Sequence, residues 1–323
     1  MRRTSGARSG SSMDIHRRQF LKTAGAAAGI IGSTCSRTLA FASAQASKVS
    51  MCDWNLGKSC DPELISLAHE AKLAGIQVSV GTAPDKIPLR DSFVRRKYLD
   101  LGAKYGITFN SVAAGSLLNR IPLKTEPQSA VYVIDAIEAA AAIGAKNILI
   151  AFFGNGDLRL QDSTGQWRNL RKSAPASYEL DAQGVNRVVE AMRQIAPRAA
   201  SVGVVLGLEN TLTAEQNLEI IDRIGSPMVQ VYYDVGNSTH FGYDVPAELR
   251  LLGAERICEI HLKDTKVPLL GSDGGEVDFT AISAACRAIG YSKWYVLETS
   301  GRKDHFLEDT LANVAFVEKL FFA

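Results

Sequence analysis

Four short apolar runs in the second half of the chain decide its fold: VVLGLE (204–209), VQVYYD (229–234), ICEIH (257–261) and WYVLE (294–298). Apolar and β-branched residues dominate each run and turn-forming residues follow it, which is typical of a strand buried on both faces. Each run ends in a residue that can bind a hard divalent metal ion. Because the strands of a parallel barrel open on one face at their carboxyl ends, such ligands can meet there. We therefore expect a metal site at the mouth of a barrel.

The rest of the chain alternates between predicted strands and predicted helices. Further strands are expected over 49–52, 75–80, from 107 onwards and over 147–153, and helices from 61 onwards and over 92–105, 128–143, 180–199, 214–224, 246–252, 278–289 and 305–322. Such alternation, without a glycine-rich phosphate fingerprint after the first strand, predicts the α/β class and a single (β/α)8 TIM barrel. The polar loop 154–175 is unusually long for a barrel, which makes it a candidate lid or substrate-binding segment.

The amino terminus carries the features of an export signal. HRRQFLK (16–22) precedes a stretch rich in glycine and alanine (23–32), and Ala-Ser-Ala (42–44) offers a cleavage site. Paired arginines followed by Phe-Leu-Lys resemble the twin-arginine signal of bacteria. A basic amphipathic tail or a membrane anchor is the alternative interpretation, but the apolar stretch is short and glycine-rich for a bilayer span.

These features divide the chain into two parts. We predict a twin-arginine export signal over 1–44 and a barrel over 45–323, with Met13 as a candidate start of translation. The mature protein would begin near Gln45, work in the periplasm, and make no stable membrane insertion after the signal is cleaved.

Composition narrows the class of partner. The chain has 323 residues, of which 46% are hydrophobic and 22% charged, and a formal net charge of +2. A single barrel of about 250 residues plus extensions fits this length. No dense basic stripe follows the first few dozen residues, which argues against a nucleic-acid or membrane-surface partner. Chemistry on a small molecule is the remaining expectation.

The cysteines of the predicted barrel do not indicate a structural zinc site, because no close CxxC pair is present. Cys52 and Cys258 lie in predicted strands, where they are expected to be small buried hydrophobes. A bridge between Cys52 and Cys60 stays open in an oxidising compartment.

The four strand-end residues Glu209, Asp234, His261 and Glu298 form a donor set made mainly of oxygen. Hard cations prefer oxygen ligands, so we expect Mn²⁺ or Mg²⁺ first, with Co²⁺ or Zn²⁺ as alternatives. Four protein ligands leave room for neighbouring oxygens of a sugar, and a cation there stabilises the charge of an enediolate. Glu209 and Glu298, which end the fifth and eighth strands, can flank one substrate carbon as ligands and as acid and base.

Four segments resemble the sugar phosphate isomerase/epimerase family, the xylose-isomerase-like TIM barrels: GLEN (207–210), YDVGN (233–237), IHLKD (260–264) and VLE (296–298). The resemblance covers nearly the whole predicted barrel. It implies a carbohydrate substrate, and pairing of two copies into a homodimer is common in the family. It also implies metal ligands at Glu209, Asp234, His261 and Glu298, with proton transfer by the two glutamates.

Around these ligands the chain follows the family only in part. Ketose epimerases of the family carry a histidine three residues after the strand-six aspartate, where it touches substrate oxygens. This chain has Asn237 at that position, which makes Asn237 a candidate substrate contact. His240, three residues further on, is a candidate for the same substrate contact, or else an exposed loop residue. Lys263 resembles a family position that points toward substrate, with a pair to a surface carboxylate as the alternative. Asp264 is expected to brace its loop, and Trp54 either stacks on a sugar face or closes the barrel.

Three classes of function follow. The first is a divalent-metal-dependent isomerase or epimerase of a sugar or keto-sugar that acts through a metal-stabilised enediolate. The second is a lyase or hydratase acting on an oxidised (3-keto) sugar or glycoside, since the same enediolate can expel a leaving group. The third is a non-catalytic carbohydrate-binding barrel. Endonuclease chemistry is disfavoured, because its multi-zinc site needs more histidines than the 5 in this chain.

Overall fold

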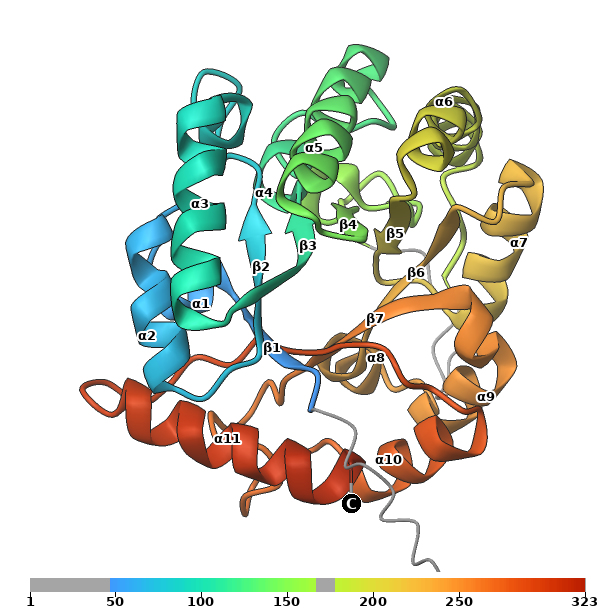
Figure 1. Ribbon diagram of the computed structural model, residues 1–323. Helices are drawn as coiled ribbons and strands as arrows, with labels where there is room; N and C mark the ends of the chain where they lie inside the picture. The colour runs from blue at the N-terminus through green and yellow to red at the C-terminus, as the bar shows by residue number, and fades with distance from the viewer. Residues whose placement is uncertain (1–46, 167–177, 323) are drawn as a thin grey trace, which may run out of the picture. The chain divides into compact units, whose positions relative to one another are not determined.

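The computed structural model describes residues 47–166 and 178–322. Its eight parallel strands close into a barrel in chain order, with β8 paired to β1, and the longer helices form a ring outside them (Figure 1). The predicted single (β/α)8 barrel is therefore confirmed. The predicted export signal over 1–44 lies outside the described residues.

The strands are β1 (Val49–Cys52), β2 (Gly75–Ser79), β3 (Thr108–Ala113), β4 (Asn147–Ala151), β5 (Val205–Glu209), β6 (Val229–Asp234), β7 (Ile257–Leu262) and β8 (Tyr295–Leu297). The α-helices are α1 (Asp53–Leu56), α2 (Ile65–Glu70), α3 (Ser92–Tyr105), α4 (Gly115–Leu118), α5 (Ala130–Ile143), α6 (Ala182–Val202), α7 (Ala214–Ile224), α8 (Val235–His240), α9 (Val245–Arg256), α10 (Phe279–Ala288) and α11 (Phe306–Phe321). Single turns of 3₁₀-helix are η1 (Pro62–Leu64), η2 (Pro88–Arg90), η3 (Pro127–Ser129) and η4 (Gly154–Gly156).

Most element boundaries follow local chemistry that the sequence displays. Helices α3 and α7 and strand β6 have the predicted limits. The helix expected from residue 61 begins with η1, where Asp61 accepts a hydrogen bond from the backbone N–H of Glu63 and Pro62 takes the first position. The long loop after β4 is described only over 154–166, so its expected role as a lid lies partly outside the described residues.

Strand β4 is shorter than expected, because it ends at Ala151 rather than at Phe153. The Phe152 side chain stays buried, and its backbone N–H donates to the carbonyl oxygen of Glu209. The Phe153 N–H turns away to the side-chain oxygen of Asn119, at 3.2 Å. The prediction included Phe152 and Phe153 in the strand because they are hydrophobic. The hydrogen bond from the Phe153 N–H to Asn119 takes the backbone out of the sheet.

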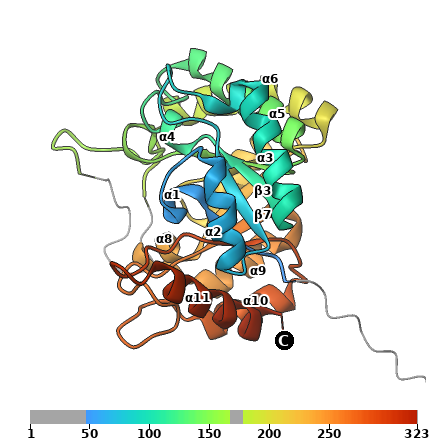
Figure 2. The same ribbon diagram turned by 60° about the vertical axis from the view of Figure 1, so that its left-hand side comes forward.

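Three short helices that were not predicted follow strands, α1 and α8 directly and α4 after one residue. Helices α4 and α8, which follow β3 and β6, lie on one side of the barrel, and the start of β1 lies on the other (Figure 2). Helices α1, α4 and α8 have four, four and six residues, so they are too short to leave a periodic pattern in the sequence. They line the face of the barrel at which the strands end.

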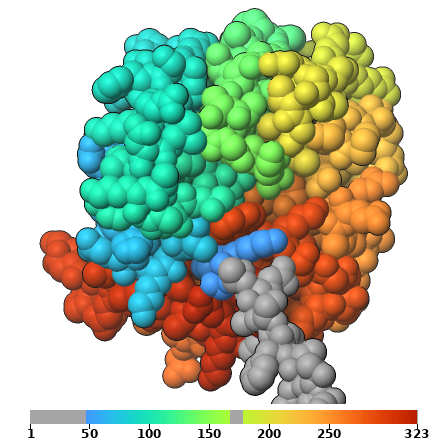
Figure 3. Space-filling model, in the orientation of Figure 1, coloured from blue at the N-terminus to red at the C-terminus, as the bar shows by residue number. Residues whose placement is uncertain are grey.

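The two ends of the described chain meet. The first residues of β1 lie against C-terminal segments in Figure 3. The backbone N–H of Tyr295 in β8 donates to the carbonyl oxygen of Lys48, and the Ser47 hydroxyl donates to Glu318 at 2.6 Å. Within the described residues, no helix combines the length and apolar character needed to cross a membrane.

Cys52 and Cys60 are both free thiols in the structure. The Cys52 thiol donates to the side-chain oxygen of Gln77 at 3.2 Å, and the Cys60 thiol donates to the carbonyl oxygen of Ser79 at 3.0 Å. Each sulfur therefore has its own hydrogen-bond partner in place of a bridge. Cys52 and Cys258 are buried in strands, as expected.

Gly207 in β5 lets neighbouring strands approach the strand that carries Glu209. A Cβ atom added there would lie 2.5 Å from the sulfur of Cys258, 3.0 Å from the carbonyl oxygen of Ile148 and 3.1 Å from the Cβ of Tyr232. No side chain fits at these distances without a shift of the strands.

We expect Gly207→Ala to lower the free energy of unfolding by ~1–3 kcal/mol, because overpacking forces the strands apart. Urea unfolding measures this loss, which should be smaller in a Cys258→Ala background that removes the closest contact. Gly115→Ala is the matched control, since its added Cβ meets nothing nearer than 3.5 Å. A Gly207→Ala protein as stable as the wild type would show that the barrel interior is looser than described.

Candidate metal centre

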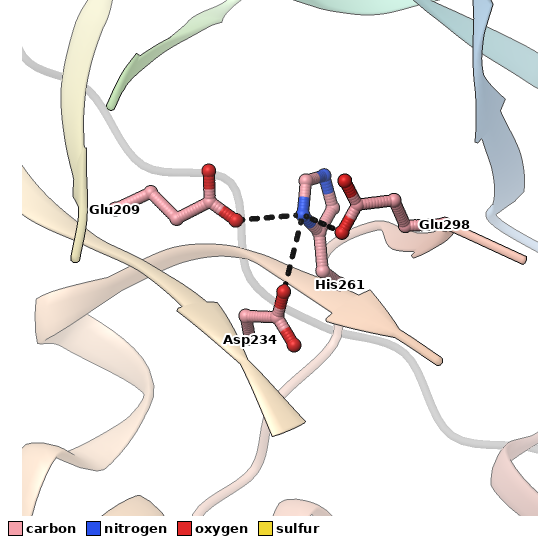
Figure 4. Close-up of side chains that lie close together, drawn as sticks. All are labelled: Glu209, Asp234, His261 and Glu298. Atoms are coloured by element: carbon pink, nitrogen blue, oxygen red, sulfur yellow. Dashed lines mark hydrogen bonds and ion pairs between the residues drawn. The ribbon is translucent and has the colours of Figure 1, made fainter. Parts of the chain in front are cut away.

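The four predicted ligands come together where the strands end. Glu209 and Asp234 are the last residues of β5 and β6, His261 is the penultimate residue of β7, and Glu298 directly follows β8. Their potential ligand atoms all lie within 4.8 Å of one another. Figure 4 shows the three carboxylates directed at one edge of the His261 ring, with Glu209 and Glu298 on opposite sides of it.

Nδ1 of His261 is the nitrogen that faces the carboxylates. It lies 3.0 Å from Oε1 of Glu209, 3.5 Å from Oε2 of Glu298 and 3.9 Å from Oδ2 of Asp234. The histidine is fully buried, and the Glu298 side chain is 21% exposed. The cluster is therefore closed toward the barrel interior and open on the side of Glu298.

Lys263 completes the cluster from the end of β7. Its ammonium lies 2.6 Å from Oε2 of Glu298 and 2.7 Å from Oδ2 of Asp234. The close approach depends on Gly236, because a Cβ there would lie 2.5 Å from Cγ and 2.8 Å from the carbonyl oxygen of Lys263. The glycine in YDVGN thus admits the lysine stem next to the carboxylates.

The charges of the cluster shift one another's pKa values. Burial alone would lower the pKa of His261, but the carboxylates of Glu209 and Glu298 outweigh it and raise this pKa to about 9. Burial raises the pKa of Asp234 to about 6, against the opposing charge of Lys263. Burial acts in the same sense on Glu298, but His261 and Lys263 outweigh it and hold its pKa below the ordinary value.

The donor set fits a divalent cation. With His261 neutral, three carboxylates face one ammonium, which leaves two negative charges uncompensated in a largely buried site. A divalent ion supplies the missing two positive charges. Three carboxylate oxygens and one imidazole nitrogen are ligands that Mn²⁺, Mg²⁺ and Zn²⁺ all accept, with the oxygens favouring the first two.

A cavity of about 480 Å³ opens above the cluster. Glu209, Glu298 and Lys263 form its charged wall. Its other lining residues are aromatic, small or uncharged: Trp54, Ser79, Ala113, Gly115, Ser116, Asn119, Leu149, Ala151, Phe153 and Asn237. Such a volume and lining suit a small polar ligand with an apolar face.

The predicted substrate contacts divide into two groups. Trp54, Lys263 and Asn237 line the cavity, and Trp54 also sets its ring edge-on to His261, 6.4 Å between ring centres. His240 is not among the described residues that line the cavity. It ends α8 with a side chain that is 55% exposed, 3.9 Å from Glu276, and so matches the exposed alternative.

Two residues that the sequence did not point to, Gln77 and Asp53, hold parts of the site in place through hydrogen bonds. Gln77 in β2 places its side-chain oxygen 3.1 Å from Nε2 of His261. Asp53 accepts hydrogen bonds from the backbone N–H groups of Cys60 and Ser79, both at 2.8 Å, and so holds the segment that carries Trp54. Burial raises the pKa of Asp53 to about 6, although these hydrogen bonds act in the opposite sense. A polar residue inside an otherwise apolar strand was the available signal for Gln77.

The loop after Lys263 is braced by its neighbour, as expected for Asp264. One carboxylate oxygen of Asp264 accepts from the backbone N–H of Lys266 at 2.8 Å, and the other accepts from those of Glu276 and Val277, at 2.8 and 3.0 Å. Asp264 is thus fully engaged with the backbone of its own loop.

Two curated proteins with related sequences are named as epimerases. The chain is 34% identical over 149 residues to a putative L-ribulose-5-phosphate 3-epimerase of Escherichia coli (strain K12), a match that covers 41% of this chain and 51% of that protein. It is 27% identical over 267 residues to the 2-epi-5-epi-valiolone 7-phosphate 2-epimerase of Actinoplanes sp., which covers 80% of this chain and 89% of that protein. The chain thus spans about half the length of the first relative.

Solved structures share the fold at low identity. An L-ribulose 3-epimerase superposes with a TM-score of 0.64 at 19% identity, over 85% of this chain and 94% of that one. A 3-keto-D-glucoside 4-epimerase of E. coli gives 0.65 at 14% identity, over 84% and 99%. The IOLI protein, described with a binding zinc atom, gives 0.60 at 16% identity, over 85% and 98%.

A family model matches most of the barrel. The model is that of the xylose isomerase-like TIM barrel, and it covers residues 65–320. The matched range includes all four residues of the cluster and the strands that present them. The chain belongs to the xylose isomerase-like TIM barrel family.

Proposed function

We propose that this chain is a divalent-metal-dependent epimerase of a free keto-sugar. The convergence of three carboxylates on Nδ1 of His261, beneath a cavity of sugar size, carries the proposal. The chain is an enzyme of its family, and both curated relatives are named as epimerases. The proposal takes only the class of reaction from these relatives and not their substrates.

The cation would be held by Glu209, Asp234, His261 and Glu298. When bound there it would lower the energy of negative charge that develops on substrate oxygens. The three carboxylates favour Mn²⁺ or Mg²⁺ over Zn²⁺. Lys263 neutralises part of their charge, which keeps the carboxylates of Asp234 and Glu298 close together.

Glu298 and Glu209 are the proposed acid and base. Both line the cavity, and they stand on opposite sides of His261 (Figure 4). In the metal-free protein His261 and then Lys263 hold the pKa of Glu298 below its ordinary value. Lys263 keeps its positive charge when an ion replaces the proton of His261, so Glu298 would remain an ionised carboxylate that can accept a proton from a carbon next to a carbonyl. Glu209, after taking up a proton from solvent, would deliver it to the other face of the resulting enediolate. Release of the abstracted proton from Glu298 to solvent would then restore the starting state. Inversion at one carbon needs such a pair of groups on opposite sides.

The cavity favours an unphosphorylated substrate. Among the described residues that line it, Lys263 is the sole cation, and two carboxylates already neutralise its charge. A phosphate dianion there would face Glu209 and Glu298 without an arginine to receive it. Export of the chain, as residues 16–22 suggest, would also bring it to free sugars rather than phosphorylated metabolites.

A lyase acting on a 3-keto-glycoside is the second candidate. A second cavity of about 700 Å³ lies on the neighbouring loops, lined by Arg120 and Gly154, the residues that follow Asn119 and Phe153 of the first cavity. A second sugar unit could be accommodated there. The same proton abstraction would then expel the glycosidic oxygen instead of inverting a carbon.

A panel of free keto-sugars, their phosphate esters and 3-keto-glycosides, incubated in D₂O with Mn²⁺ and followed by NMR, tests the assignment. We expect deuterium at a carbon next to the carbonyl, an inverted product, and kcat/KM at least ~10-fold higher for the free sugar than for its phosphate, equivalent to ~1.4 kcal/mol. Loss of the aglycone identifies the lyase. Binding without exchange would contradict both, and a preference for the phosphate that Arg120→Ala abolishes would contradict the free-sugar assignment.

We expect Glu298→Gln to reduce kcat by ~10²–10⁴-fold, because the amide cannot accept the proton. Metal content and thermal unfolding are measured on the same protein, so that loss of the ion or of the fold is recognised. Glu276→Gln, on the exposed loop after β7, is the control and should keep wild-type turnover. Wild-type turnover in Glu298→Gln would remove this residue from the mechanism.

Metal binding should release a proton, because an ion replaces the one that the carboxylates hold on His261. Below the pKa of about 9 the proton competes with the ion, so the apparent affinity for Mn²⁺ should rise with pH and level off above that value. Calorimetry at pH 7.5 in two buffers of different ionisation enthalpy should give about one proton per ion. His261→Gln should bind more weakly and release almost none. A binding enthalpy independent of the buffer would contradict the exchange.

A further inference from the structure

A polar network lies inside the barrel beneath the metal centre. At its base is Glu259 of β7, which is fully buried. One of its carboxylate oxygens accepts from the hydroxyls of Tyr232 and Ser111 and the amide of Asn110, at 2.6, 2.8 and 2.8 Å, and the other accepts from the amide of Asn147 at 2.7 Å. Burial raises the pKa of Glu259, and the four hydrogen-bond donors act in the opposite sense. Four donors around one carboxylate stabilise its ionised form, which can only accept hydrogen bonds.

Gln77 of β2 joins this network to the metal centre. Its amide nitrogen lies 2.7 Å from the Tyr232 hydroxyl and 3.1 Å from that of Ser111. Its amide oxygen lies 3.1 Å from Nε2 of His261 and also accepts from the thiol of Cys52, at 3.2 Å. One side of the Gln77 amide thus faces the two hydroxyls that contact Glu259. The other side faces Nε2 of His261, the ring nitrogen directed away from the three carboxylates.

The Glu259 carboxylate sets the donor and acceptor roles in the hydrogen bonds that connect it to His261. Because Glu259 can only accept, the single hydroxyl protons of Tyr232 and Ser111 go to it. Both hydroxyls can then only accept from Gln77, so the amide must present its NH₂ group to them and its oxygen to His261. The Cys52 thiol lies 3.5 Å from Nε2 but donates to the Gln77 oxygen at 3.2 Å, so the group left to pair with this oxygen at 3.1 Å is an Nε2 that carries the hydrogen. Nδ1 therefore keeps a lone pair for a cation once its own proton leaves.

The strand pairing is irregular at Gln77 and Tyr232, two members of this hydrogen-bond network. The register of β2 against β3 shifts between Ile76 and Gln77, and that of β6 against β7 shifts between Val231 and Tyr232. After the shifts Gln77 stands beside Ser111, and Tyr232 beside Glu259. Bulges near active sites commonly re-aim a side chain. Here both irregularities occur where the network must reach the barrel centre.

We propose that Gln77 is a positioning residue for the metal ligand His261, and that Glu259 sets its orientation through Tyr232 and Ser111. The inference rests on the proposed metal-dependent function. A hydrogen bond from the distal ring nitrogen to an oxygen fixes the tautomer and strengthens the other nitrogen as a ligand. Here that oxygen belongs to the Gln77 amide. The amide is oriented by the charge of Glu259, which lies two residues before His261 in β7.

The first test measures metal affinity, with Mn²⁺ and Zn²⁺ as probes in calorimetry. Gln77→Met removes the acceptor and Glu259→Gln removes the acceptor-only charge, and each should weaken binding by ~10–100-fold. Glu248→Gln is the matched control and should stay within ~2-fold. Glu248 is also a buried glutamate that accepts from a tyrosine, Tyr233, at 2.7 Å, but no hydrogen bond links it to His261.

The second test reads the tautomer directly. In ¹⁵N-histidine-labelled protein loaded with Zn²⁺, the His261 signals, assigned with a His261→Gln sample, should show hydrogen on Nε2 and the ion on Nδ1. Tyr232→Phe keeps the ring but removes the nearer of the two acceptors for the Gln77 amide, so it should weaken Zn²⁺ binding even if the other two variants fail to fold. It should also broaden or shift the Nε2 signal.

The outcomes separate this inference from the proposed function. Wild-type protein that binds the ion, with variants of equal affinity or with hydrogen on Nδ1, overturns the inference alone. Wild-type protein that binds neither Mn²⁺ nor Zn²⁺ overturns the metal-dependent function and the inference with it. Weaker binding in Glu248→Gln equal to that in Glu259→Gln would show a general loss of packing and also count against the inference.

Discussion

Repulsion among three carboxylates in a largely buried site is the constraint on which the mouth of this barrel depends. Glu209, Asp234 and Glu298 converge on one imidazole edge, and Lys263 alone cannot balance them. In the metal-free protein part of the missing positive charge comes from His261, whose pKa rises to about 9 so that it carries a proton. A divalent ion meets the same deficit more completely. The acid–base chemistry proposed for the glutamates depends on this balance, because the charges near Glu298 decide whether it can accept a proton.

The barrel supplies the geometry that makes such crowding possible. Parallel strands deliver side chains far apart in sequence to one rim, and small residues let the backbone approach closely where the rim is built. Gly207 admits the strands next to β5, and Gly236 admits the stem of Lys263. The short helices α1 and α8 begin directly at the ends of β1 and β6, so Trp54 and Asn237 reach the cavity without a long loop.

The interior of the barrel is not uniformly apolar. Glu259, Tyr232 and Gln77 form a hydrogen-bonded column below the cluster, and its members satisfy one another's donors and acceptors. A buried network of this kind is costly when incomplete and specific when complete. At Gln77 and Tyr232 the pairing passes over one residue of the partner strand, Asn110 of β3 and Cys258 of β7. Because side chains alternate between the two faces of a strand, this shift brings Ser111 and Glu259 to the same face as their partners.

The sequence by itself determined the alternation of strands and helices, the closed barrel and the four residues at its carboxyl-end rim. These follow from local hydrophobic runs, caps and turns, and from one general property of parallel barrels. It did not reveal Gln77, Asp53 or Glu259 as partners of the site, because a lone polar residue in an apolar strand does not say which side chain it will meet. Only the tertiary structure decided that His240 lies outside the cavity, that Lys263 bridges two ligands, and that Cys52 and Cys60 remain free. Each of these depends on distances between segments remote in sequence, which the register and closure of the barrel set.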